Sequence, residues 1–361
     1  MGFTIYLIIL MEIRINYANI KWLGVDQFPS SSSWSQNNVC RKNFGFNGRQ
    51  VSFCRSNFEW MSLTKASTAD TKEECKDMLK DRRWNCQSVN KAPEYDDDLK
   101  KDTKESALLH SLAASSLALS IARGCMAGKL DKCSCFQTTR QFSFPSEMID
   151  PRNLSNIDNM VGCKDITRVG VEFANLFMKL GFREKATNEI QEKSYTIRKH
   201  NIDLGLKELA QGEEIACICN GATAGCTTKY CHRRLKEYPV ISKILLKKYD
   251  EAAFAKLKRL PVNDVKEDVK NTFQIPFSQS EKLLYLDEGP DQCKIVNGFH
   301  KSSRRQCVLD DAQPNSCSKL CCYGYREKVI EIISECNCKF VYCCRVECDK
   351  CKSMKKVYEC V

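Results

Sequence analysis

Apolar residues recur at helical spacing in several stretches of the first two thirds of the chain. Residues 105–123 (ESALLHSLAASSLALSIAR) contain neither Gly nor Pro, and apolar residues occupy most sides of the helix that they would form. This pattern predicts a well-buried helix. Further helical patterns follow at 171–179, at 202–209 and at 238–258. The first part of the chain is therefore predicted to be mainly α-helical.

The pattern changes between the last two of these helices. Asn220–Gly221 is a pair typical of tight hairpin turns, because both residues tolerate positive φ. Cysteines surround the pair, so that nested bridges 217/231 and 219/226 would clamp a hairpin twice. Near the end of the chain, alternating stretches at 339–342 and 356–358 indicate short strands or hairpins.

Cysteines divide the chain into two parts. Of 24 cysteines, twelve lie between Cys40 and Cys231 and twelve between Cys293 and Cys360. The last part holds few large aliphatic residues, so cross-links worth about 2–4 kcal/mol each must limit the entropy of its unfolded state. We expect an α+β protein with a helical domain at 19–259 that includes the hairpin 217–231, a polar linker at 260–282, and a small disulfide-rich β-hairpin domain at 283–361.

So many cysteines indicate either disulfides in an oxidising compartment or metal thiolates in a reducing one. The apolar run at 3–11 (FTIYLIILM) is shorter than the roughly 20 residues that a membrane span needs. It favours a signal peptide over residues 1–18, with cleavage near Ala18; the alternative is a buried strand of the mature protein. Asn153-Leu154-Ser155 is an N-glycosylation sequon, consistent with secretion into the extracellular space or matrix.

The formal net charge of +11 favours polyanionic partners. In a secreted protein these would be heparan sulfate proteoglycans rather than nucleic acid, and the alternative is a merely solvated basic surface. The basic clusters are Arg233, Arg234 and Lys236; Lys247 and Lys248; Lys256, Lys258 and Arg259; and Arg304 and Arg305.

The residues offer little for metal binding or catalysis. Cys348 and Cys351 form a single C-x-x-C, and the four histidines are scattered, so zinc ligation is not expected. The sequence has no G-x-S-x-G elbow, no phosphate-binding glycine loop and no catalytic cysteine signature. Cysteines held in disulfides cannot act as nucleophiles. We therefore expect a protein that is not an enzyme and that needs no cofactor or metal.

Two cysteine motifs stand near the end of the chain, at residues 317–325 (CSKLCCYGY) and 336–351 (CNCKFVYCCRVECDKC). The first resembles the C-x-x-L-C-C-x-x-G-Y segment of the Wnt family and is one residue shorter before the last tyrosine. The second resembles the family's C-N-C-x-F-x-W-C-C-x-V-x-C-x-x-C. Upstream, 74–75 (EC) with 82–86 (RRWNC), then 123–125 (RGC) with 132–135 (KCSC), and His200–Asn201 with Gly205 follow in family order. The resemblance spans residues 75–360.

The resemblance implies a complete disulfide pairing, which spacing alone could not supply. In the first domain the implied pairs are Cys75–Cys86, Cys125–Cys133, Cys135–Cys163, Cys217–Cys231 and Cys219–Cys226. In the second they are Cys293–Cys322, Cys307–Cys317, Cys321–Cys360, Cys336–Cys351, Cys338–Cys348 and the vicinal pair Cys343–Cys344. Cys40 and Cys54 are left over and are expected to pair with each other.

The resemblance also implies a mechanism. In the family, the acyltransferase Porcupine attaches a mono-unsaturated fatty acyl chain to a serine at the hairpin tip, and that chain enters a groove in the cysteine-rich domain of Frizzled receptors. A fingertip loop of the second domain contacts the opposite side of the same receptor domain. A lipoprotein-receptor-related co-receptor and a secretion carrier are further implied partners. In this chain the fingertip residues are Lys339, Phe340, Val341, Tyr342, Cys343 and Cys344. For Phe340 and Tyr342 the alternative is ordinary core packing.

The chain departs from the family at the acylation site. Where the family has C-H-G-x-S-G-S-C, residues 219–226 read CNGATAGC, so that Thr223 replaces the acceptor serine and Asn220 the preceding histidine. His232 also stands where a tryptophan is usual. Thr223 is therefore the expected lipidation site. The alternatives are an unacylated Wnt-like ligand or antagonist, and a secreted disulfide-rich protein that binds lipid or glycan without Frizzled signalling.

Overall fold

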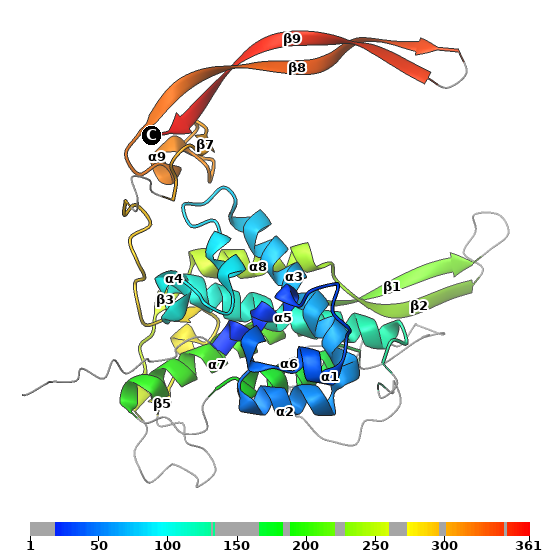
Figure 1. The fold of residues 1–361 in the computed structure, drawn as a ribbon, viewed down its shortest axis with the longest axis vertical. Helices are drawn as coiled ribbons and strands as arrows, with labels where there is room; N and C mark the ends of the chain where they lie inside the picture. Colours follow the sequence, from blue (N-terminus) through cyan, green and yellow to red (C-terminus); the bar gives the residue numbers. More distant parts are fainter. Residues whose placement is uncertain are drawn as a thin grey trace, which may run out of the picture. The chain divides into compact units, whose positions relative to one another are not determined.

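The computed structural model describes residues 19–130, 133, 166–182, 188–220, 228–259, 273–295, 301–342 and 345–361, with the backbone alone at 19, 166, 217–220 and 228–233. The chain forms two compact units (Figure 1). The helical unit comprises Met1–Ala69 and Lys91–Gly289, and the cysteine-rich unit comprises Asp70–Asn90 and Pro290–Val361. The predicted signal peptide at 1–18 and the sequon at Asn153 lie outside the described residues.

The helical unit contains most of the regular structure. Its helices are α1 (Gln36–Val39), α2 (Gly48–Ser56), the first part of α3 (Met61–Leu79), α4 (Asp97–Lys100), α5 (Lys104–Met126), α6 (Ile166–Leu180), α7 (Glu189–Gln211) and α8 (Tyr238–Asp250). Its strands are β1 (Glu213–Asn220), β2 (Thr228–Leu235), β3 (Ala253–Phe254), β4 (Lys258–Arg259), β5 (Phe273–Gln274) and β6 (Leu284–Tyr285).

Helix α5 is the core of the helical unit, as its sequence pattern predicts. The Thr103 side chain caps it by accepting a hydrogen bond from the Ser106 amide (3.1 Å). Almost every later residue is buried, because α6, α7 and α8 surround the helix (Figure 1). Among the described residues it is the one helix apolar and long enough to cross a bilayer, yet 89% of its most apolar window is buried inside the unit. We therefore describe it as a core helix.

Glycines let the neighbouring helices approach α5 closely. A Cβ on Gly170 of α6 would lie 2.1 Å from the Ala118 carbonyl oxygen, and one on Gly205 of α7 would lie 2.2 Å from that of Ser111. Side chains larger than glycine cannot fit at such distances. The resemblance motif around Gly205 thus has a packing function in this fold.

Asn201, from the same motif, holds a distant strand. Its side-chain amide donates to the Leu284 carbonyl (2.9 Å), and its carbonyl oxygen accepts from the Leu284 amide (3.0 Å). The neighbouring His200 Nε2 lies 2.8 Å from the Lys282 carbonyl oxygen. These contacts attach residues 282–284 to α7.

Two predictions about residues 238–282 need correction. The helix predicted over 238–258 ends at Asp250, because the backbone of Ala253–Phe254 pairs with Leu284–Tyr285 as β3 with β6. The described part of the predicted linker, residues 273–282, belongs to the helical unit, where β5 pairs with β4 and Phe273 is buried. Residues 260–272 lie outside the description.

The cysteine-rich unit gathers distant segments around disulfides. Its later part contains α9 (Cys317–Leu320), β7 (Gln306–Cys307), β8 (Tyr325–Val341) and β9 (Arg345–Cys360), with the strand order β7-β9-β8. Its small core consists of Cys307, Cys317, Leu320, Cys321 and Cys360, against which Tyr358 packs. Sulfur atoms thus replace the large aliphatic side chains that this segment lacks.

Residues 70–90 belong to the cysteine-rich unit, whereas the sequence pattern assigned them to the helical domain. Two arginine side chains join residues 70–90 to the rest of this unit: Arg305 donates to the Arg83 carbonyl (3.1 Å), and Arg83 donates to the Lys319 carbonyl (2.8 Å). Helix α3 contributes to both units, since the division falls between Ala69 and Asp70. The predicted α+β class, with a mainly helical first part and a disulfide-rich β end, is confirmed.

Candidate functional site

The tip of the β8–β9 ribbon exposes large apolar side chains. Phe340 is 74% exposed and Tyr342 is 97% exposed, and Val341 and Val346 are exposed beside them. Across the strands Phe340 faces Val346. The core-packing alternative for Phe340 and Tyr342 is therefore wrong. Exposed aromatic residues on a projecting element form a surface suited to burial against a partner.

Two disulfides brace the strands below the tip. Cys336 is bonded to Cys351, and Cys338 is bonded to Cys348. The register shifts between Cys336 and Lys339, where Asn337 has a positive φ of 49°. This bulge, together with the two bridges, sets the direction in which the tip residues project. Cys343 and Cys344 lie outside the described residues, so their vicinal bridge stays a prediction.

A second projecting element is the β1–β2 hairpin (Figure 1). Its strands pair antiparallel from Glu213↔Leu235 to Asn220↔Thr228, and the register places the backbone of Cys217 opposite that of Cys231. A cross-strand bridge requires this placement. The hairpin tip, with Thr223 and Cys226, lies outside the described residues, as do Cys135 and Cys163.

The disulfides of the described residues join cysteines as the sequence predicted. Besides those below the tip, the pairs that the family resemblance implies are Cys75–Cys86, Cys125–Cys133, Cys293–Cys322, Cys307–Cys317 and Cys321–Cys360. The two cysteines that were left over, Cys40 and Cys54, are bonded to each other. The Cys75–Cys86 bridge closes the segment that belongs to the cysteine-rich unit by its contacts.

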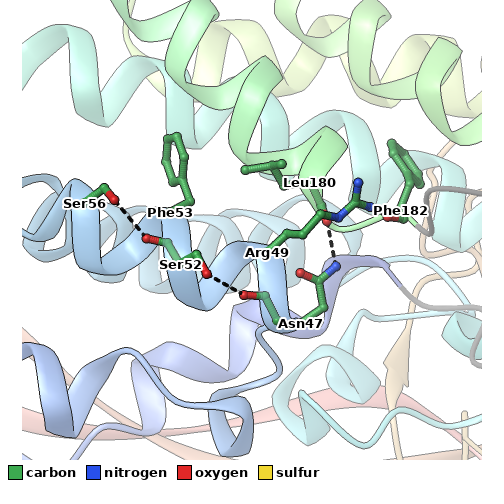
Figure 2. Close-up of a pocket in the computed structure, with 8 residues that line it drawn as sticks. Asn47, Arg49, Ser52, Phe53, Ser56, Leu180 and Phe182 are labelled. Carbon is green, nitrogen blue, oxygen red and sulfur yellow. Dashed lines mark hydrogen bonds between the residues drawn. The ribbon is translucent and has the colours of Figure 1, made fainter.

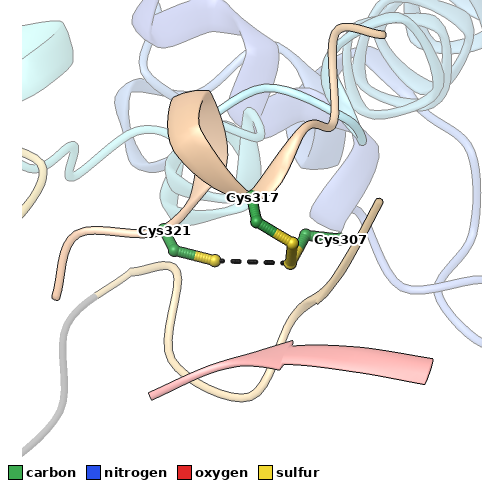
Figure 3. A group of neighbouring side chains, drawn as sticks. All are labelled: Cys307, Cys317 and Cys321. Carbon is green, nitrogen blue, oxygen red and sulfur yellow. Dashed lines mark hydrogen bonds between the residues drawn. A yellow bond between two sulfur atoms is a disulfide. The ribbon is translucent and has the colours of Figure 1, made fainter. Parts of the chain in front are cut away.

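Two groups of potential metal ligands occur among the described residues. Figure 3 shows one of them: Cys307, Cys317 and Cys321, with the Cys321 sulfur 3.6 Å from that of Cys307. All three sulfurs are in disulfides, with Cys321 bonded to Cys360. The other group is Glu335 with the bonded pair Cys338–Cys348. Because metals bind thiolates, neither group has the donor set for zinc.

A surface pocket of about 780 Å³ lies between α2 and the end of α6 (Figure 2). The polar groups that line it bond to the chain itself: Asn47 donates to the Leu180 carbonyl (2.6 Å), Arg49 donates to that of Phe182, and Ser52 donates to that of Gly48 (3.2 Å). Asn47 and Arg49 thus attach the start of α2 to the end of α6, and Ser52 bonds within α2. The pocket therefore gives no indication of a ligand.

A buried polar group lies at the start of α5. Arg198 of α7 forms a buried ion pair with Asp102. His110 is also buried; its Nδ1 lies 2.7 Å from the Ser106 carbonyl oxygen, and its Nε2 has no hydrogen-bond partner among the residues that the structure describes. Burial, and then the positive charge of Arg198, lower the pKa of His110 to about 4. The group is enclosed in the helical core, which indicates a structural role.

Sequence reasoning missed the extent of the β8–β9 ribbon. It predicted short strands, whereas β8 runs from Tyr325 to Val341. The β-branched run at 329–333 (VIEII) is a signal that could have revealed the longer strand.

Comparisons with known proteins agree with this architecture. A family model described as the wnt family matches residues 42–361. Wnt-11 of Xenopus laevis is 31% identical over 360 residues, with 98% of this chain and 97% of that protein covered. Wnt-11 of Gallus gallus is 30% identical over 358 residues, with the same shares covered. A chain in the solved structure of human WLS in complex with WNT8A matches with a TM-score of 0.54 and 21% identity, over 91% of this chain and 100% of that chain, which shows a shared fold.

Proposed function

This chain belongs to the Wnt family, and from that premise we propose that it is a secreted ligand that binds the cysteine-rich domain of Frizzled receptors and activates Wnt signalling. Members of the family are signalling ligands rather than enzymes. The observation that carries the proposal is the ribbon tip, where Phe340 and Tyr342 are exposed between braced strands.

The tip supplies the protein part of the receptor contact. Burying an aromatic side chain against a partner contributes roughly 1.5–3 kcal/mol, and aromatic anchors often dominate binding energy. The two disulfides keep the tip in one shape before binding, which reduces the entropy lost on association. Lys339 and Val341 complete the described part of the fingertip.

Alanine variants test this contact. We expect Phe340→Ala and Tyr342→Ala each to weaken binding to an immobilised Frizzled cysteine-rich domain by about tenfold or more. Phe277→Ala is the matched control, because Phe277 is an aromatic residue of the helical unit that is 93% exposed. Unchanged binding of both tip variants would contradict the proposal. Failure of the unaltered chain to bind any Frizzled domain would favour the lipid- or glycan-binding alternative.

Thr223 carries the fatty acyl chain in this proposal, by analogy of position with the family's acceptor serine. Threonine retains the hydroxyl but adds a methyl group on the same carbon, which restricts χ1 and crowds the oxygen. We expect partial acylation as a result. Each buried methylene of the chain would contribute about 0.8 kcal/mol to receptor binding without regard to direction.

Mass spectrometry of the 217–231 peptide from secreted, receptor-active protein tests the acylation. We expect a mono-unsaturated acyl mass on Thr223, a higher acylated fraction in Thr223→Ser, and none in Thr223→Ala. An unmodified peptide in active protein would remove the lipid from the mechanism. The tip contact would then carry the binding, so the two parts of the proposal can fail separately.

Further partners follow from the same proposal. A structure with the same fold is of human WLS in complex with WNT8A, and we propose a WLS-type carrier for secretion of this chain. Porcupine would attach the acyl chain, and a lipoprotein-receptor-related co-receptor would join the signalling complex. The net charge of +11 supports retention by heparan sulfate proteoglycans in the extracellular matrix.

A further inference from the structure

The outer edge of β8 is an exposed, apolar strand edge. Within the described residues β8 pairs with β9 alone, so the other edge of the strand presents backbone groups without strand partners. The edge segment, residues 329–333 (VIEII), consists of β-branched residues around one glutamate. Val329 is 50% exposed and Ile333 is 60% exposed. An edge of this kind is a template for pairing with another strand.

The opposite edge of the ribbon is protected by charge. Strand β9 carries Lys350, Lys352, Lys355 and Lys356, all exposed. Lysine on an edge strand opposes pairing, because its charge would have to be desolvated. The two edges of one ribbon therefore differ, and the edge segment of β8 is the one that lacks lysine.

The edge segment reads almost the same in both directions about Glu331. In an antiparallel pairing with itself, Val329 would face Ile333 of the second copy, and Ile330 would face Ile332. We propose that the edge segment pairs with the same segment of a second copy of this chain, forming a two-fold symmetric dimer with the strand order β9-β8-β8-β9. A two-fold axis requires such a self-complementary pattern.

Lysines of β9 compensate the acidic residues that this pairing brings together. The two copies of Glu331 meet at the axis, and each is paired with its own Lys352 (2.7 Å). Glu327, which would face Glu335 of the second copy, is paired with its own Lys356 (2.9 Å). The two Glu331 carboxylates still repel each other at the axis, so replacing Glu331 by an uncharged residue should strengthen association.

The dimer would present two receptor-binding tips. Antiparallel pairing points the two tips in opposite directions along the paired strands, and a rise of about 3.3 Å per residue puts each tip roughly 35 Å from the axis. The tips would thus lie roughly 70 Å apart. One dimer could engage two receptor domains, which raises avidity without any new contact.

Sedimentation equilibrium of the secreted full chain tests the proposal, with Thr223→Ala as the background so that no acyl chain contributes. We expect a monomer–dimer equilibrium. Glu331→Gln should tighten it roughly two- to fivefold, because it removes the like charges at the axis. Ile333→Lys should weaken it by at least about tenfold, because it places a charge in the paired edge. Ile333 is exposed in the single chain, so the variant should fold.

Met354→Ser is the matched control. Met354 lies on β9 opposite Glu331 and is exposed on the same face of the ribbon, but it is not on the paired edge. We expect its dimer constant to equal that of the background. If Met354→Ser abolishes association and Ile333→Lys does not affect it, then the ribbons associate through their faces. That result would overturn pairing through the β8 edge.

Hydrogen exchange gives a second measurement. Raising the protein concentration should slow exchange in the peptide covering 326–336 and leave the β9 peptide covering 346–356 unchanged. A chain that remains monomeric at all concentrations, including Glu331→Gln, would refute the proposal. Association that requires Thr223 would also refute it, since the acyl chain would then be the cause.

Discussion

Acid should destabilise the helical unit through His110. The His110 side chain is buried in α5, its Nδ1 contacts the Ser106 carbonyl oxygen at 2.7 Å, and no group in the described part of the chain hydrogen-bonds its Nε2. Protonation would place a second buried cation near Arg198. Burial and that charge lower the pKa of His110 from its ordinary value of 6.5 to about 4, with a smaller opposing effect of Asp102.

The size of the effect follows from this difference in pKa. Above pH 6.5 the imidazole is neutral in the folded and the unfolded chain, so it adds no pH dependence. Between pH 6.5 and 4 the unfolded chain binds the proton more readily, and stability falls as the pH falls. One pKa unit corresponds to about 1.4 kcal/mol, so the loss at pH 4 is about 3 kcal/mol. Below pH 4 both states are protonated and the loss levels off.

Urea unfolding with the disulfides intact, followed from pH 7.5 to 4, measures this loss. We expect the unaltered chain to lose about 3 kcal/mol more than His110→Gln over this range. Carboxylates whose pKa is lowered by ion pairs also lose stability in acid, but their contribution cancels between the two proteins. His200→Gln gives a second comparison and not a neutral control, because burial lowers the pKa of His200 as well. Equal acid losses in the unaltered chain and His110→Gln would refute the reasoning.

Two further changes test the packing around α5. Gly205→Ala should lower the free energy of unfolding by about 1–3 kcal/mol, because its Cβ would meet the Ser111 carbonyl oxygen at 2.2 Å. Gly48→Ala is the control, because a Cβ there would have no neighbour within 4 Å. In the same denaturation assay it should change the free energy of unfolding by under about 0.5 kcal/mol. Asp102→Asn should lower the free energy of unfolding by about 3–5 kcal/mol, because it removes the negative charge that faces the buried Arg198. A loss of stability under about 1 kcal/mol would contradict that account.

Several features could be predicted from local sequence. Helix α5 could be predicted, because a run without Gly or Pro that is apolar on most sides is stable in a protein of this size as a buried helix. The cysteine framework followed from the spacing of the family motifs, not from geometry. The fingertip residues came from the same motifs, and the structure adds that Phe340 and Tyr342 are exposed rather than buried.

Other features depend on partners that are distant in sequence. The end of α8 is one: residues 253–254 continue the apolar pattern of the helix, but pairing with 284–285 gives their backbone groups different partners. Another is the assignment of residues 70–90, which depends on the hydrogen bonds made by Arg305 and Arg83.

The β8–β9 ribbon shows why some features can be predicted from the sequence and others cannot. Hydrophobic periodicity reports which side of an element faces a core, so it predicts elements that have one. The sequence by itself therefore determined the buried helices and, through its cysteine motifs, the family. Within the described parts of the chain, strand β8 covers no core, and its apolar and charged residues are exposed on both faces. Only pairing with β9 and the bridges Cys336–Cys351 and Cys338–Cys348, all tertiary contacts, decided its length and the position of its tip.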